Sequence, residues 1–206
     1  AYSLVAVILL GVGLCLMCVN RPDLRRRNDC SPLPPHRLAR ELVLALLLYA
    51  LAALALFALF GLVLGVSPLA SWRTGLMLLN ALVLSLWALS LSFMLGTVTR
   101  TNNMLVCCSH VFTMVSSFVS GVFVPQALLG DALLRVARFL PVYWYVLVND
   151  SAATMTGAEP GALRTITGAL GMQVLFAAAF LCVGLVLNKR KDRKSTRLNS
   201  SHRIRS

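Results

Sequence analysis

Hydroxyl side chains recur along an apolar stretch in the middle of the sequence, residues 104–124. The polar groups of this stretch are Ser109, His110, Thr113, Ser116, Ser117 and Ser120. The hydroxyls at positions 109, 113, 116 and 120 follow a 4-3-4 spacing, which places them on one face of a helix. Such a face can line a polar path through a membrane. It can also pack against a neighbouring helix while each hydroxyl bonds a carbonyl one turn earlier. The spacing leaves both functions open.

The reactive side chains give little support to enzymatic chemistry. His110 is the only ionisable group well inside a predicted span, which makes it a functional candidate, although it lies about two turns from the end of that span. A serine nucleophile needs a base within reach, and Phe118 stands where a G-x-S-G motif would have its first glycine. A metal site needs several ligands on facing helices, and the predicted spans contain no carboxylate. We therefore expect no catalytic, metal or cofactor site in this chain.

The composition is that of an integral membrane protein. Of the 206 residues, 58% are hydrophobic and only 13% are charged, which is more apolar surface than a soluble domain can bury. The net charge of +12 would suit a nucleic-acid partner, but the basic residues lie between apolar stretches, as in cytoplasmic membrane loops. We therefore expect no nucleic-acid partner.

Five of the six cysteines lie in predicted spans and Cys30 lies in a loop, so no disulfide framework follows. Cys15 and Cys18 form a C-x-x-C, most simply two small apolar side chains.

Five stretches are long and apolar enough to cross a hydrocarbon core of about 30 Å, which requires about 20 residues in a helix. They are residues 1–19, 42–66, 75–98, 104–124 and 165–187. The expected fold class is therefore an all-α integral membrane protein. Small residues recur along the third span at Ala81, Ser85, Ala88, Ser92 and Gly96. Such a stripe lets helices approach closely, and we expect it to pack. Asn80, the one amide of this span, is expected near its outer end.

The most polar internal stretch is residues 20–40. Its arginines predict a cytoplasmic loop, and its prolines at 32, 34 and 35 interrupt helix formation before the next span. The loop can also dock a cytoplasmic partner, which requires a shaped element, and Pro22 suits the first turn of a short helix. The residues of this docking segment are Arg21, Asp23, Leu24, Arg25, Arg26 and Arg27.

Basic residues also predict the orientation. Lys189, Arg190 and Lys191 follow the last predicted span directly. With both basic clusters in the cytoplasm, the number of spans must be odd and Ala1 lies outside. We expect residues 1–191 to form a membrane domain that lacks one upstream span, and residues 192–206 to form a tail. From Lys194 onward the tail resembles adapter-derived read-through, so it is excluded from the fold prediction.

The segment between the fourth and fifth spans predicts an element at the outer membrane face. After a break at Pro125, residues 126–140 form an amphipathic helix that is too short to cross, and Pro141 ends it. The aromatic residues that follow suit the membrane interface. The polar and aromatic residues of this outer interfacial element are Asp131, Arg135, Arg138, Tyr143, Trp144 and Tyr145.

Three segments carry a resemblance to a known family: SGVFVPQALLG (120–130), FLPVYWYVLVND (139–150) and the loop RPDLRRRNDCSPLPPHRLARE (21–41). In layout and in these segments the chain resembles the membrane subunit of an ABC-2 type exporter, over about residues 1–191. The resemblance implies that the five spans correspond to family spans two to six. It also implies that the docking segment contacts an ATPase, and that a short interfacial or re-entrant helical element precedes the last span.

The resemblance implies the function as well. It makes the chain a permease subunit of an ATP-driven exporter that moves a drug, lipid or glycolipid-like cargo. The subunit would be a multi-pass protein of the bacterial plasma membrane. The sequence has no G-x-x-x-x-G-K-[ST] motif, so ATP and magnesium would bind a separate cytoplasmic ATPase subunit. A second permease copy would complete the path. The alternative functions are a non-transporting membrane scaffold or regulator and, with less support, an intramembrane enzyme.

Overall fold

A computed structural model describes residues 1–21, 24, 27, 35–64, 71–99, 101–155 and 160–203. These residues form helices and no strand, so the expected all-α membrane fold is confirmed. Five helices are long and apolar enough to cross a membrane. They are α1 (Tyr2–Val19), α3 (Pro35–Val63), α4 (Trp72–Val98), α5 (Asn102–Val119) and α8 (Pro160–Arg203).

Local chemistry explains where these helices begin. Pro35 opens α3, because a proline in the first turn lacks only an amide that has no helical partner there. The Ser71 hydroxyl caps α4 by accepting from the Arg73 amide at 3.3 Å, and the Thr101 hydroxyl caps α5 by accepting from the Met104 amide at 3.2 Å. The predicted spans therefore start after the observed helices do: residue 42 is seven residues after the start of α3, and residue 75 is three residues after the start of α4. Helix α8 also outruns its predicted end, because no Gly or Pro follows residue 187.

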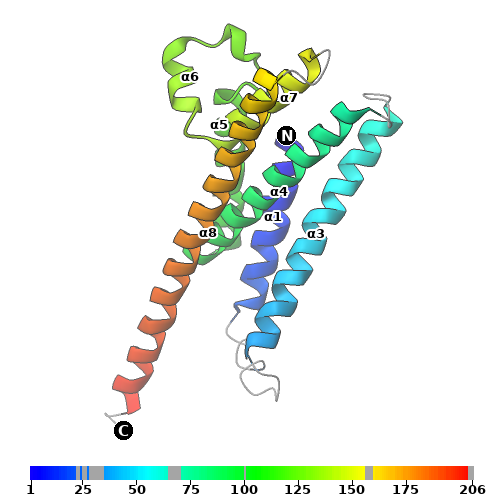
Figure 1. Cartoon of the computed structure of the whole chain (residues 1–206). Coiled ribbons are helices and arrows are strands. Elements are labelled where there is room, and N and C mark those ends of the chain that lie inside the picture. Colours follow the sequence, from blue (N-terminus) through cyan, green and yellow to red (C-terminus); the bar gives the residue numbers. More distant parts are fainter. Residues whose placement is uncertain are drawn as a thin grey trace.

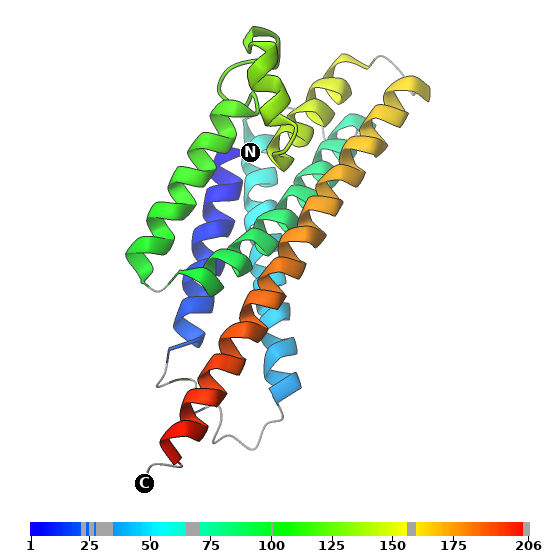
Figure 2. The same ribbon diagram turned by 90° about the vertical axis from the view of Figure 1, so that its left-hand side faces the viewer.

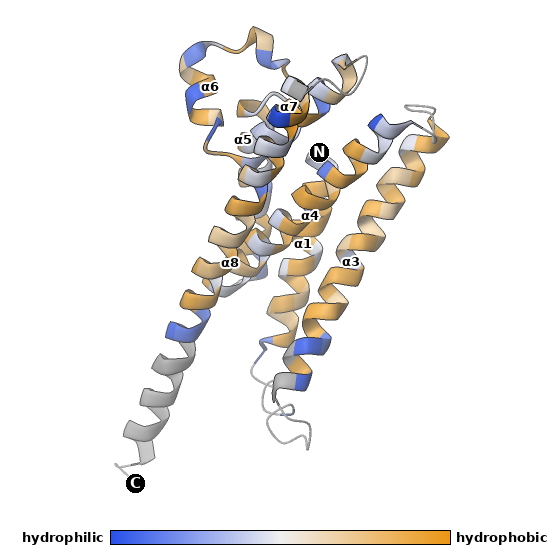
Figure 3. Ribbon diagram, in the orientation of Figure 1, coloured by the Kyte–Doolittle hydropathy of each residue, from blue (hydrophilic) through white to orange (hydrophobic). Residues whose placement is uncertain are grey.

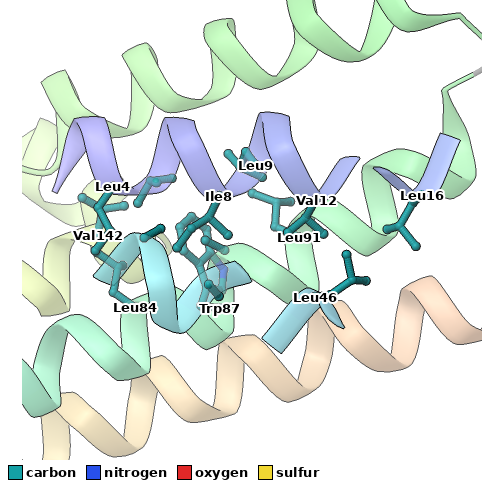
Figure 4. Packing of buried hydrophobic residues seen from close by; sticks show 14 residues of the cluster. Leu4, Ile8, Leu9, Val12, Leu16, Leu46, Leu84, Trp87, Leu91 and Val142 are labelled. Atoms are coloured by element: carbon teal, nitrogen blue, oxygen red, sulfur yellow. The ribbon is translucent and has the colours of Figure 1, made fainter. Parts of the chain in front are cut away.

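Helix α4 lies at the centre of the bundle. It contacts α1, α3, α5, α7 and α8, and Figures 1 and 2 show it crossing between α1 and α8. Trp87 of α4 is fully buried, and Ile8 of α1 is fully buried beside it in the same apolar cluster. Figure 4 shows these side chains filling the space between α1 and α4. The core of the chain is therefore the α1–α4 interface, from which the other helices spread.

Small residues bring α1 and α4 into close contact. The buried Ser92 hydroxyl donates to the Leu9 carbonyl at 2.8 Å. A Cβ on Gly13 of α1 would lie 2.8 Å from the Leu105 side chain and 3.2 Å from the Ser92 hydroxyl. Glycine and serine permit this close approach. Ser92 of the stripe along α4 therefore packs against α1, as predicted.

The segment after α5 differs from the prediction. The expected single helix over residues 126–140 is wrong: a 3-10 turn, η1 (Gln126–Leu128), is followed by a short helix, α6 (Asp131–Ala137). Leu129 and Gly130 adopt extended backbone between them, so the amphipathic pattern is split. Pro141 does not end a helix but opens α7 (Pro141–Thr154), again as a favourable first-turn residue.

Helices α6 and α7 together make an outer hairpin, residues 131–154. Val142, in the first turn of α7, packs in the apolar cluster with Leu4 and Leu84. Met155, which ends α7, accepts a hydrogen bond from Arg73 near the start of α4. Helix α7 therefore starts in the core of the bundle and runs out to the end of the molecule where α4 begins, next to α6 (Figure 2).

The layout agrees with an odd number of crossings. Figure 1 shows the end of α1, the start of α3 and the end of α8 at one end of the bundle, with the outer hairpin at the other. Figure 3 shows apolar residues along the spans and hydrophilic residues where α3 starts and where α8 leaves its apolar part. Arg27, Arg40, Lys189 and Arg190 are exposed at that basic end, which suits the cytoplasmic side.

Two single cysteines test this orientation. We expect Arg27→Cys and Asp150→Cys, each in a background without the six native cysteines, to react with an impermeant thiol reagent from opposite sides of a sealed vesicle, because both residues are exposed. The measurement is labelling before and after the vesicles are opened with detergent. Labelling of both cysteines from the same side would refute the five-span topology.

Candidate functional site

The hydroxyl face of α5 lies inside the protein. Its hydroxyl side chains are at most 2% exposed, whereas His110 is exposed on the other side of the helix. The Thr113 hydroxyl donates to the Ser109 carbonyl at 2.7 Å, and the Ser116 hydroxyl donates to the Thr113 carbonyl at 3.1 Å. The buried hydroxyls so gathered are Ser109, Thr113, Ser116, Ser117 and Ser120. Helix α1 packs on α5, and the buried hydroxyl face is not open to solvent in this structure.

The predicted docking segment is described only in part. Arg21 and Arg27 are exposed and Leu24 is half-buried. Asp23, Arg25 and Arg26 lie outside the described residues. The two exposed arginines are at the basic end of the bundle, beyond the last turn of α1.

The charged residues of the outer hairpin face away from the bundle. Asp131, Arg135 and Arg138 are exposed, and Ala137 is the buried residue of α6. Val136 and Phe139 are also exposed, at 58% and 76%. This part of the hairpin thus presents both charge and apolar surface outward, as an element at a membrane interface does.

The aromatic cluster faces inward more than the sequence predicts. Tyr143 is buried, and Trp144 and Tyr145 are half-buried. The Trp144 indole donates to the Arg138 carbonyl at 3.0 Å and its ring packs edge-on against Tyr143 at 5.4 Å. Burial raises the pKa of the Tyr145 hydroxyl, with a smaller opposing effect from a hydrogen bond with Asn149. The Trp144 contacts therefore join the two helices of the hairpin, and the partly buried rings do not form an exposed aromatic belt.

A polar cluster that the sequence analysis missed joins three helices. The Asn80 amide of α4 donates to the Tyr145 carbonyl and to the Asn149 side-chain oxygen of α7, both at 3.0 Å. The Gln173 amide of α8 donates to the Asn80 side-chain oxygen at 2.8 Å. Asn80 and Gln173 are fully buried. We call Asn80, Asn149 and Gln173 the amide cluster. In the sequence, Asn80 and Gln173 are each the single side-chain amide of an apolar span. The sequence analysis singles out Asn80 but not Gln173.

Two further contacts tie the hairpin to the spans. The Arg73 guanidinium of α4 donates to the Met155 carbonyl at the end of α7. The Gln126 amide donates to the Ser120 carbonyl at 2.9 Å and to the Tyr143 carbonyl at 3.4 Å, so it connects the end of α5 to the first turn of α7. Helix α7 is therefore held at both ends and in its middle.

The end of α5 depends on a glycine. Gly121 has φ +94°, and the Val122 amide donates to the Ser117 carbonyl at 3.0 Å, which together make a Schellman cap. The helix therefore ends before Pro125, where the sequence predicted the break. A left-handed residue here turns the chain so that Gln126 comes back over the helix end.

An apolar cavity of about 730 Å³ lies between the outer ends of α1, α3 and α4. Its lining includes Leu54, Phe57, Trp72, Met77 and, from α7, Tyr145. Among the described residues, no group of three or more His, Cys, Asp or Glu side chains gathers that could hold a metal ion.

The comparison with family models gives one match. The model described as "ABC-2 type transporter" matches residues 31–148, which is more than half of the chain. The matched residues run from the start of α3 into α7 and include Asn80, whereas Asn149, Gln173 and the docking segment lie beyond them. No curated protein and no solved structure matches the chain.

Replacing Gly121 by alanine tests the cap of α5. We expect Gly121→Ala to destabilise the fold by about 1–2 kcal/mol, because a left-handed backbone strains any residue with a Cβ, and because that Cβ would lie 2.5 Å from the Gln126 side chain. The matched control is Gly130→Ala, since Gly130 has φ −65° and open space around it. The measurement is unfolding of the detergent-solubilised protein followed by circular dichroism. Equal stability of the two variants would contradict this role of Gly121.

Proposed function

The chain belongs to the ABC-2 type transporter family, and on that premise we propose that it is the membrane-spanning permease subunit of an ATP-driven exporter. The observation that supports this most is the family match over residues 31–148, which covers the three spans α3, α4 and α5 and most of the outer hairpin. The permease is a multi-pass protein of the bacterial plasma membrane in this proposal.

The energy comes from a separate cytoplasmic ATPase subunit that binds ATP and magnesium. The printed sequence has no phosphate-binding G-x-x-x-x-G-K-[ST] loop, which supports a division of labour between two subunits. The docking segment, residues 21–27, contacts that ATPase. Its support is the exposure of Arg21 and Arg27 at the same end of the bundle as Arg40, Lys189 and Arg190, because a basic cytoplasmic surface suits a soluble partner.

The cargo is apolar or amphipathic, such as a drug, a lipid or a glycolipid-like molecule. The apolar cavity between α1, α3 and α4 supports this class, because about 730 Å³ is within the range of pockets that take small organic ligands. Two permease copies pair to complete the path in this proposal. The exposed apolar side of α5, with Val111, Met114 and Phe118, offers surface for that pairing.

Reconstitution distinguishes a permease from a non-transporting scaffold or regulator. The chain is placed in proteoliposomes with the candidate ATPase, and efflux of a fluorescent lipid and of an apolar dye is followed with and without ATP. A permease gives ATP-dependent efflux of at least one probe and stimulates ATP hydrolysis. A chain that binds the ATPase, stimulates no hydrolysis and moves neither probe would support the scaffold.

Alanine substitution tests the docking segment. We expect Arg21→Ala, Arg25→Ala, Arg26→Ala and Arg27→Ala, combined in one variant, to weaken co-purification with the ATPase by about tenfold or more, because several charged contacts are lost together. The matched control is Arg135→Ala with Arg138→Ala, which removes exposed arginines from the opposite end of the bundle. If the first variant bound the ATPase as tightly as the control, the docking role would be wrong.

A further inference from the structure

We propose that the amide cluster is a lock that holds α7 seated in the core of the bundle and lets it be released as a unit. The cluster has an unusual position. Asn80 is the ninth residue of α4, about 12 Å along the helix from its outer end, and it is fully buried. Because its side chain is fully buried, its hydrogen-bond partners come from the protein.

Asn80 is the hub of the lock. Its amide group donates two hydrogen bonds to α7, and its oxygen accepts one from Gln173 of α8. One of the acceptors is the Tyr145 backbone carbonyl, so the bond fixes the backbone of α7 and does not depend on a side-chain conformer of α7. Helix α7 also packs between α4 and α8, with Val148 and Ala152 buried.

Among the described residues, four buried polar side-chain atoms have no hydrogen-bond partner: Trp87 Nε1, the Ser109 hydroxyl, the Ser120 hydroxyl and the Gln173 side-chain oxygen. The last two lie beside the contacts that hold α7. An unpaired buried acceptor raises the free energy of the state that contains it. Of these last two atoms, one is in the amide cluster and the other is at the end of α5, beside the carbonyl that Gln126 bonds. Two of the four unpaired atoms therefore lie where α7 is held, and a movement of α7 can give them new partners.

The other contacts of α7 suit the same movement. Arg73 and Gln126 hold its two ends through backbone carbonyls, and the amide cluster holds its middle. The hub of that cluster, Asn80, is fully buried. Asn80 and Gln173 act in this proposal as positioning residues. What the release serves rests on the proposed function: α7 would leave the outer end of the path during export.

Cysteine accessibility measures the lock directly. Val148→Cys places a thiol on the buried side of α7, where the native side chain is 1% exposed, in a full chain without the six native cysteines. The chain is reconstituted in proteoliposomes, and the rate of reaction with a charged, membrane-impermeant maleimide is measured. Asp150→Cys is the exposed reference and should react at the same rate in every background.

The expected result is a graded order. Asn80→Leu removes all three hydrogen bonds of the hub and should speed labelling of Val148→Cys by about tenfold or more, as the loss of interhelical bonds in a membrane would. Gln173→Leu leaves both bonds between α4 and α7 in place, so it should speed labelling less. Asn188→Leu removes an amide from the same helix outside the cluster and should change nothing.

The outcomes separate lock, fold and function. A leucine suits an apolar span, so faster labelling without a fall in the unfolding midpoint identifies a lock and not general destabilisation. Unchanged labelling in Asn80→Leu, or equal acceleration in Asn188→Leu, would overturn the lock. Labelling needs neither ATPase nor cargo, so that failure would leave the proposed function standing. A chain that shows the graded order but neither binds an ATPase nor supports efflux would instead overturn the proposed function alone.

Discussion

A polar group inside a hydrocarbon core has no water to bond, and this constraint shapes the whole chain. Most backbone groups satisfy it by forming helices, and the Thr113 and Ser116 hydroxyls of α5 satisfy it by bonding carbonyls within their own helix. The amides of Asn80 and Gln173 cannot do so, because their donors and acceptors need partners on other helices. The bonds they make connect α4, α7 and α8. The arrangement of the outer half of the bundle follows from that need.

Hydropathy and basic-residue placement were enough to predict the spans, since the requirement of about 20 apolar residues depends on local composition alone. The helix starts were predicted less well. Ser71 and Thr101 act as caps through single hydrogen bonds, and such caps extend a helix beyond its apolar part. The packing stripe of α4 was predictable because small residues at helical spacing have one dominant use in membranes.

The outer hairpin was predicted in kind but not in detail, and the amide cluster was not predicted as a cluster. The amphipathic pattern over residues 126–140 could not reveal that extended backbone at Leu129 and Gly130 divides it. From the sequence alone, a proline that follows the end of one helix cannot be told from a proline in the first turn of the next, and Pro141 is in the first turn of α7. Gln173 could have been noticed as a lone amide within its span, but its partner Asn80 lies 93 residues away in the sequence. Only the fold brings them together.

The position of Pro141 has an electrostatic consequence. Helix α7 begins inside the apolar core, where the unpaired amides of a first turn carry a partial positive charge. Proline removes one of those amides, and the Tyr143 amide is paired with the Leu140 carbonyl at 3.1 Å. The end of α5, whose last carbonyls carry the opposite partial charge, lies beside this turn through their shared partner Gln126. The two helix ends, whose partial charges are opposite, thus meet at one neutral side chain, Gln126.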